Sequence, residues 1–311
     1  MAAYAFRRLL AGAPTILGVT LLTFLLFHVA GGNPVVAFLG KSATPAEIAA
    51  LEREYGFDRP LPEQYLRYLG ELARLDFGRS FATREPVLEL LSKGAGPSLS
   101  LTLPALLFGT LLAIGLGLWS ARRRGRASDR GLLLATVVGM SVSFLLYIVA
   151  GQYLLAFYWP LFPIHGYDPG LLDRWPYLAL PIGILIVVGL GYDVRYFRAV
   201  LGQELGRDHV LVARARGLPE GAVLGRHVLR NALVPILARV MMAVPFLLTG
   251  SLLLESFFGI PGLGHTLLDA VEAADLPVLK AYTLFLSVLL VGANLLTDLL
   301  YAALDPRVRL G

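Results

Sequence analysis

Six long apolar runs constrain this chain more than any other feature. They cover residues 9–30, 98–120, 132–157, 177 to about 197, 233–254 and 278–303. A helix needs about 20 residues to cross the roughly 30 Å hydrocarbon core of a bilayer. Charged residues make up only 16% of the chain, against about a quarter in soluble domains. The pattern predicts an all-α polytopic membrane protein with six transmembrane helices. The first run is too long for a signal peptide, which favours an uncleaved span. The fourth is the least defined, because Asp193 and Arg195 lie near its end.

Arginines gather in four segments that six crossings would place on one side of the membrane. These segments precede the first run, separate the second from the third and the fourth from the fifth, and follow the sixth. The short connections 159–176 and 255–277 carry a single basic residue, Arg174. Because basic residues accumulate in cytoplasmic loops, we expect both termini to be cytoplasmic.

Residues 31–96 are expected to form a small helical extracytoplasmic cap between the first two spans. In "ATPAEIAALEREYG", Thr44 and Glu47 form a capping box around Pro45, and Gly56 ends the helix. A second, amphipathic helix presents one face made of Leu61, Tyr65, Tyr68, Leu69 and Leu72. The chain then divides into residues 1–30 with the first span, the cap 31–96, a membrane core 97–303 that contains a cytoplasmic segment 199–231, and a tail 304–311.

Several motifs imitate catalytic or ligand sites without completing them. "FLGKS" resembles the end of a phosphate-binding loop, but Val35 stands where its first glycine is required. The five histidines lack the spacing of a helical zinc site. A Ser251–His265 hydrolase dyad would lack a nucleophile-elbow context. We therefore expect no enzyme activity, metal or cofactor on this chain, and no motif indicates nucleic acid.

A compact basic stretch, "VARARGLPEGAVLGRHVLRNALVPIL", interrupts the apolar sequence between the fourth and fifth runs. Gly217 can end one helix and Pro219 can begin another, which predicts a helix–turn–helix elbow. Val223, Leu224, His227 and Val228 share one stripe of the second arm, away from Arg226 and Arg230. Such an elbow could rest on lipid headgroups or dock in the groove of a partner protein.

Five ordered stretches resemble one family along essentially the whole chain. They are "LLTFLLFHVAGGNP", "YGFDRPLPEQYLRYLGELARLDFGRSF", "ARARGL" with "RHVLRNALVP", "ESFFGIPGLG" and "NLLTDLLYAALDPRVR". Together they resemble the permease subunits of ABC importers, in the dipeptide/oligopeptide/nickel permease family. The resemblance implies the type I ABC importer permease fold in the cytoplasmic (inner) membrane of a prokaryote.

The same resemblance implies how the elbow works and what surrounds it. In the family this loop is a coupling helix that inserts into an ATPase subunit, and the matching residues here are Ala213, Arg214, Ala215, Gly217 and Leu218. Leu211 and Val212 depart from the general glutamate–alanine–alanine signature, and Pro235 follows Gly217 at a longer interval, a form common in the peptide branch. The implied partners are a second homologous permease, two ATPase subunits that bind ATP and Mg, an extracytoplasmic solute-binding protein and membrane lipid. The implied cargo is di- or oligopeptide, with nickel complexes, glutathione or oligosaccharides as alternatives.

Three polar residues inside the last two spans are candidates for a polar pair or for the lining of a transport path. Arg239 lies about two turns into the fifth run, and Asn294 and Asp298 share a face of the sixth. Charges at such depth are costly unless paired, so we predict that Arg239 and Asp298 approach each other or that Asp298 faces water. A secondary transporter remains an alternative, but it would be expected to carry more such residues at mid-membrane.

Overall fold

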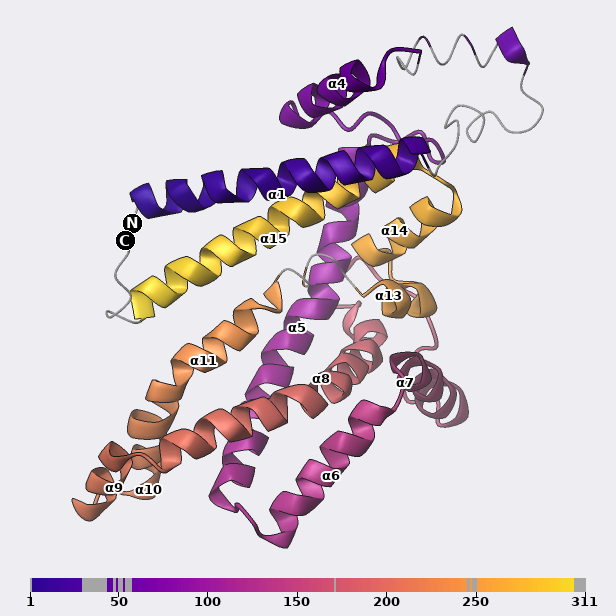
Figure 1. Cartoon of the computed structure of the whole chain (residues 1–311). Coiled ribbons are helices and arrows are strands. Elements are labelled where there is room, and N and C mark those ends of the chain that lie inside the picture. The colour runs from indigo at the N-terminus through magenta and orange to yellow at the C-terminus, as the bar shows by residue number, and fades with distance from the viewer. Residues whose placement is uncertain are drawn as a thin grey trace.

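The computed structural model is built of helices throughout the part of the chain that it describes (Figure 1). That part comprises residues 2–29, 44–46, 49, 53, 58–170, 172–244, 247 and 251–304. Within it, the only β contact is an isolated bridge between Arg79 and Pro86.

Fourteen named helices follow one another in the described residues, and two of them, η1 and η2, have the wider π-helical turn. Their bounds are α1 Ala2–Val29, α4 Leu61–Ala73, α5 Val87–Arg122, α6 Ala127–Ser141, α7 Phe144–Gly151, η1 Gln152–Tyr158, α8 Trp175–Leu205, α9 Asp208–Ala215, α10 Glu220–Ala222, η2 Val223–Leu229, α11 Arg230–Met241, α13 Leu252–Phe258, α14 Leu263–Glu272 and α15 Leu276–Leu304.

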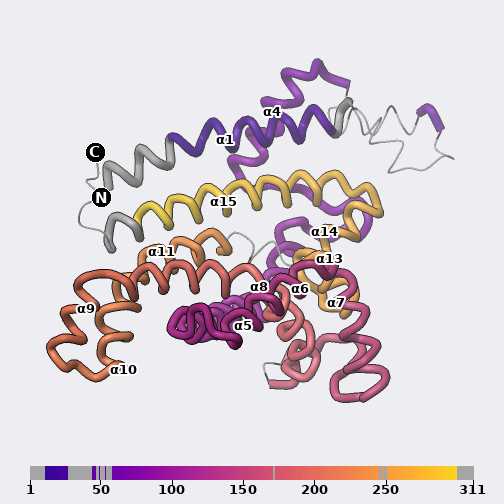
Figure 2. The backbone as a smooth tube through the Cα atoms, turned by 60° about the horizontal axis from the view of Figure 1, so that its bottom comes forward, coloured from indigo at the N-terminus to yellow at the C-terminus, as the bar shows by residue number. Residues whose placement is uncertain are grey.

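By length and composition, three of the described helices can cross a membrane: α5, α8 and residues 276–299 of α15. The bent pair of α6 with α7 and η1 makes a fourth if it is one span. α1 contributes an apolar helical stretch, Ala11–Leu26, and lies beside α15 in both views (Figures 1 and 2).

The centre of the bundle is the crossing of α5 and α8. Gly117 of α5 lies so close to α8 that a Cβ atom there would be 2.9 Å from the backbone nitrogen of Arg198. Arg198 in turn forms a two-pronged ion pair with the buried Asp129 of α6, at 2.7 and 2.8 Å. Asp129 also accepts hydrogen bonds from the Ser120 hydroxyl and the Gly125 backbone N–H. One arginine therefore joins α5, α6 and α8 at one end of the bundle.

The third predicted span, 132–157, is not one straight helix. α6 ends at Ser141, Val142 and Ser143 are extended, and the chain resumes in α7 at an angle of 93°. The Tyr147 hydroxyl donates to the carbonyl oxygen of Gly139 at 2.9 Å across the bend. Backbone groups freed by a break inside a membrane must find protein partners, and this tyrosine supplies one.

The fifth predicted span, 233–254, is also interrupted. α11 ends at Met241, and Ser251 has an extended conformation (ψ 93°) immediately before α13. Pro245 and Gly250 lie outside the described residues. The predicted end of this span at Leu254 is therefore wrong, because Leu254 belongs to the separate helix α13.

A buried carboxylate explains the "ESFFGIPGLG" motif. Glu255 is fully buried and accepts hydrogen bonds from the Ser98 hydroxyl (2.8 Å) and from the backbone N–H groups of Ser251, Gly264 and His265 (3.1, 2.7 and 3.1 Å). Two of these N–H groups belong to the first turn of α14, which has no intrahelical acceptor for them. The carboxylate of α13 thus caps α14 and binds it to α5.

The cap contains the amphipathic helix that the sequence predicts, as α4. Tyr68 and Leu72 are buried in a cluster with Phe24 of α1 and Leu284 of α15, whereas Leu61, assigned to the same face, is exposed. The predicted division between cap and membrane core at residues 96 and 97 falls inside α5, which begins at Val87. In the first predicted cap helix, Pro45 and Ala46 are helical, and Glu47 and Gly56 lie outside the described residues.

The cap is fastened to the helices by a second buried carboxylate. Asp275, which precedes α15, accepts hydrogen bonds from the Ser80 hydroxyl and from the backbone N–H groups of Phe81 and Ala82 (3.1 and 3.2 Å). This contact fixes the "DFGRSF" turn on the start of α15.

Candidate functional site

The basic stretch folds into the predicted elbow at one end of the bundle. Figures 1 and 2 place α9 and α10 beyond the ends of α8 and α11, while α7, α13 and α14 lie at the other end. α8 stops at Leu205, Gly206 caps it, and the extended Arg207 redirects the chain into the eight-residue helix α9. The sequence did not predict this first turn.

Gly217 ends α9 in the left-handed conformation that the elbow requires, with φ at +75°. Its N–H bonds to the carbonyl oxygen of Arg214 (2.9 Å), and the N–H of Leu218 bonds to that of Ala213 (3.3 Å). This pair of bonds is the Schellman arrangement, for which glycine is the usual residue. Pro219 then caps the second helix and does not occupy its first turn.

An ion pair closes the elbow around this turn. Arg214 donates to both carboxylate oxygens of Glu220, at 3.3 and 2.9 Å. These hydrogen bonds hold the pKa of the Glu220 carboxyl below its ordinary value. Arg214, expected to contact a partner, is thus engaged within the elbow, although its side chain is 40% exposed.

The second arm has the predicted buried stripe in an unpredicted geometry. Val223 and Val228 are fully buried, Leu224 and His227 are half-buried, and Arg226 and Arg230 are exposed. The segment is the π-helix η2. π-helical turns are rare and occur frequently at functional sites.

The elbow packs as one body with the ends of α8 and α11. Val210 and Ala213 of α9 share an apolar cluster with both helices and with η2, formed also by Val194, Phe197, Leu201, Val223, Val228, Ala232 and Ile236. His209 adds a polar contact, since its Nε2 lies 2.9 Å from Nδ2 of Asn231. Displacing the elbow must therefore displace α8 and α11 with it.

The predicted coupling residues do not share one face. Ala213 is only 3% exposed and lies in the elbow's own core, so it cannot touch a partner in this conformation. Ala215, Gly217 and Leu218 are exposed. Beside them, Leu211 and Val212 are 54% and 49% exposed. The elbow thus presents an apolar tip, which we define as Leu211, Val212, Ala215 and Leu218.

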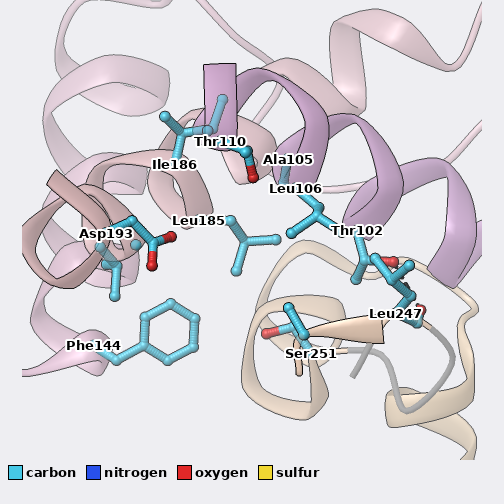
Figure 3. A pocket seen from close by; sticks show the side chains of 14 residues that line it. Thr102, Ala105, Leu106, Thr110, Phe144, Leu185, Ile186, Asp193, Leu247 and Ser251 are labelled. Atoms are coloured by element: carbon cyan, nitrogen blue, oxygen red, sulfur yellow. Dashed lines mark hydrogen bonds between the residues drawn. The ribbon is translucent and has the colours of Figure 1, made fainter. Parts of the chain in front are cut away.

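A hollow lies deeper in the bundle between α5, α8 and the chain after α11. It measures about 390 Å³, and its walls are mostly apolar. Figure 3 shows the carboxylate of Asp193 and the ring of Phe144 on one side, Thr102 and Ser251 on the opposite side, and Leu185 between them. A second hollow of about 210 Å³ adjoins it and shares Leu106, Thr110, Asp193 and Ala243 with the first.

Arg239 forms an ion pair where these hollows meet, but not with the residue predicted. Its Nε lies 3.0 Å from Oδ1 of Asp193 in α8. Among the ion pairs of the described residues, Arg239 is joined to Asp193 and not to Asp298; the alternative, that Asp298 faces water, stays a prediction. Asp298 is half-buried and Asn294 is exposed on α15. Arg239 also lines the smaller hollow, as a residue of a polar path would.

The described contacts do not join the remaining catalytic candidates, Ser251 and His265. The ring of His265 contacts Ser256 (3.4 Å) and Asp269 (3.6 Å), while the backbone of Ser251 binds Glu255. The described residues contain no group of three or more His, Asp or Glu side chains that could hold a metal ion. Val35 lies outside the described residues.

Sequence reasoning missed Asp193 and Glu255, although each left a signal. Asp193 was read only as a mark of where the fourth span ends, yet α8 continues for twelve residues beyond it. A carboxylate inside an apolar helix generally has a partner, and Arg239 was a positive charge at comparable depth. Glu255 precedes Gly262 and Gly264, where a Cβ atom would crowd its carboxylate.

Comparison with known proteins agrees with this architecture. The family described as "Binding-protein-dependent transport system inner membrane component" matches residues 113–310, and the N-terminal family of the same systems matches residues 1–102. A dipeptide transport system permease protein, DppB of Lactococcus lactis, is 36% identical over 312 residues, covering 100% of both chains. The oligopeptide transport system permease protein AppB of Bacillus subtilis is 32% identical, and a putative peptide permease of Brucella ovis 33%, each covering 99% of both chains.

The family matches span nearly the whole chain and include the elbow, and the relative from Lactococcus lactis also covers the residues of the hollow. The chain therefore belongs to the family of inner membrane components of binding-protein-dependent transport systems, as a multi-pass membrane protein.

Proposed function

We propose that this chain is a translocating permease subunit of an ATP-driven peptide importer. Its relatives are named as dipeptide, oligopeptide and peptide permeases. In this proposal the chain crosses the membrane six times, with both termini and the elbow in the cytoplasm. It provides half of the channel beside a second homologous permease, receives peptide from an extracytoplasmic binding protein, and carries no ATP site of its own.

The apolar tip of the elbow is the observation that carries the coupling role. The tip projects from a body that packs against both α8 and α11. Lipid headgroups would be bound by the arginines alone and at any spacing, whereas a groove in a protein selects an apolar face. We therefore assign the tip to one of the two ATPase subunits of the complex, which bind ATP and Mg, and treat headgroup binding as secondary.

Substitutions that add charge at the tip test this assignment. Val212→Glu and Leu218→Glu alter exposed side chains, so the chain should insert in the membrane normally but fail to co-purify with the ATPase subunits. Gln203→Glu adds the same charge at an exposed position on α8 and serves as the matched control. The lipid role would be favoured if both tip variants assemble normally with the ATPase subunits and if the elbow loses its contact with the membrane surface when Arg216 and Arg226 are neutralised.

Cargo is tested in the reconstituted complex. With the binding protein present, di- and oligopeptides should stimulate ATP hydrolysis and accumulate in the vesicles. Stimulation by nickel complexes, glutathione or an oligosaccharide, with none by peptides, would assign a different cargo to the same importer.

A further inference from the structure

The Asp193–Arg239 ion pair joins the two helices that enter and leave the elbow. Asp193 lies twelve residues before the end of α8, and Arg239 lies nine residues after the start of α11. At 1.5 Å per residue these positions are about 18 and 14 Å from the elbow. The pair therefore connects the two helices at a similar depth, at the inner end of the apolar cluster that runs from the elbow to Val194 of α8 and Ile236 of α11.

Both members of the pair also face the hollows. Asp193 lines the larger and the smaller hollow, and Arg239 lines the smaller one. Their side chains are 24% and 39% exposed, so the contact is not sealed inside a dry core. Any relative movement of α8 and α11 must stretch this ion pair, and the hollow between them must then change shape.

Among the residues that the structure describes, no second ion pair links α8 to α11 at that depth. The polar contact of α9 with α11, through His209 and Asn231, lies at the elbow itself. Tyr196 of α8 donates to the carbonyl oxygen of Pro235 in α11 at 3.3 Å, one turn nearer the elbow. Among the described residues, the Asp193–Arg239 ion pair is the charged link between α8 and α11.

Building on the proposed function, we infer that Asp193 and Arg239 are positioning residues for transport. Their ion pair links α8 to α11 at the level of the hollows, so that α8, the elbow and α11 move as one rigid unit. A movement of the elbow is then transmitted to the hollows. Without the pair, the elbow would still dock and the ATPases would still hydrolyse ATP, but α8 and α11 could slide past each other. Transport would then lose its connection to ATP hydrolysis.

The test measures uptake per ATP hydrolysed in the full complex, reconstituted in vesicles with the binding protein and peptide. For Asp193→Asn and for Arg239→Gln we expect normal assembly and ATP hydrolysis within twofold of wild type, but at least a tenfold fall in uptake per ATP. The charge-reversed double variant, Asp193→Arg with Arg239→Asp, should recover at least a third of the wild-type ratio. Asp193→Glu, which keeps the charge, should recover at least half and covers the case in which the double variant misfolds.

Arg195→Gln is the matched control, because Arg195 is an exposed arginine two residues along α8 whose described contact is the Met140 sulfur at 3.8 Å. It should leave the ratio within twofold. The inference is overturned if the single variants keep a normal ratio, if uptake and hydrolysis fall in parallel, or if neither rescue variant recovers the ratio. Absence of ATP-driven uptake in the wild-type complex would instead refute the proposed function.

Discussion

Removing the Glu255 carboxylate should lower the free energy of unfolding by an amount that depends on how many of its four hydrogen bonds are lost. Glu255→Ala leaves three backbone N–H groups without their acceptor, that of the buried Gly264 and those of the part-buried Ser251 and His265. An unsatisfied buried donor costs about 1–3 kcal/mol, so the expected loss is at least about 1–3 kcal/mol and reaches about 3–9 kcal/mol only if water stays away from all three groups.

Glu255→Gln should cost less, because one side of the site can tolerate an amide. The Ser98 hydroxyl, now a donor to the carboxylate, can rotate and accept from the glutamine NH₂. The remaining oxygen still accepts from Gly264 and His265, whereas the N–H of Ser251 and the hydroxyl proton of Ser98 lose their acceptor. The expected loss is therefore about 1–3 kcal/mol.

Thermal unfolding of the purified chain in detergent, followed by tryptophan fluorescence, measures both variants. Soluble domains of 150–250 residues lose about 2–4 °C in Tm per kcal/mol, so Glu255→Gln should lower Tm by roughly 2–12 °C and Glu255→Ala by more. Glu272→Gln, at an exposed position on α14, is the control and should leave Tm nearly unchanged. A Tm for Glu255→Ala equal to that control, or above that of Glu255→Gln, would refute the proposed clamp.

Three further substitutions probe other contacts. Gly117→Val places a side chain against the backbone of α8 and should cost about 1–3 kcal/mol by overpacking, whereas Gly115→Val, whose Cβ would meet nothing within 4 Å, should cost less; comparison of their Tm values decides. Asp275→Asn should speed hydrogen exchange in the cap turn that Asp275 holds, and unchanged exchange there would count against it. Ala213→Glu should lower Tm because it buries a charge, while Ala215→Glu at an exposed position should spare Tm and affect only partner binding; equal Tm values would contradict the packing described for α9.

The sequence predicted the elements whose chemistry is local. Gly217 predicted a helix end because glycine readily adopts positive φ. The stripe through Val223 and Val228 predicted the buried face of the second arm. The amphipathic helix α4 followed from its own periodicity. Each of these features depends on a few neighbouring residues.

The breaks in the third and fifth spans depend on particular side-chain hydrogen bonds, which the apolar composition of a segment does not encode. Apolar composition indicates that a segment can lie in the membrane, but it does not indicate where the backbone turns inside that segment. The bend after Ser141 is held by Tyr147, and the break at Ser251 is held by Glu255.

The candidate site was predicted in part for the same reason. Helical periodicity gave the depth of Arg239 but not which neighbouring helix its side chain faces, so Asp298 was chosen over Asp193. Similarly, the family motif located α9 but did not separate Ala213, which faces the elbow's own core, from the exposed tip.

The wide turn of η2 sets which side chains of the second arm are buried together. Val223 and Val228 are five residues apart and both buried, which a π-helical turn allows; in an α-helix their side chains would point about 140° apart. An α-helical turn would instead place His227, four residues along, on the side of Val223. The width of this turn therefore decides that Val228, and not His227, packs with Val223 in the apolar cluster between the apolar tip and α11.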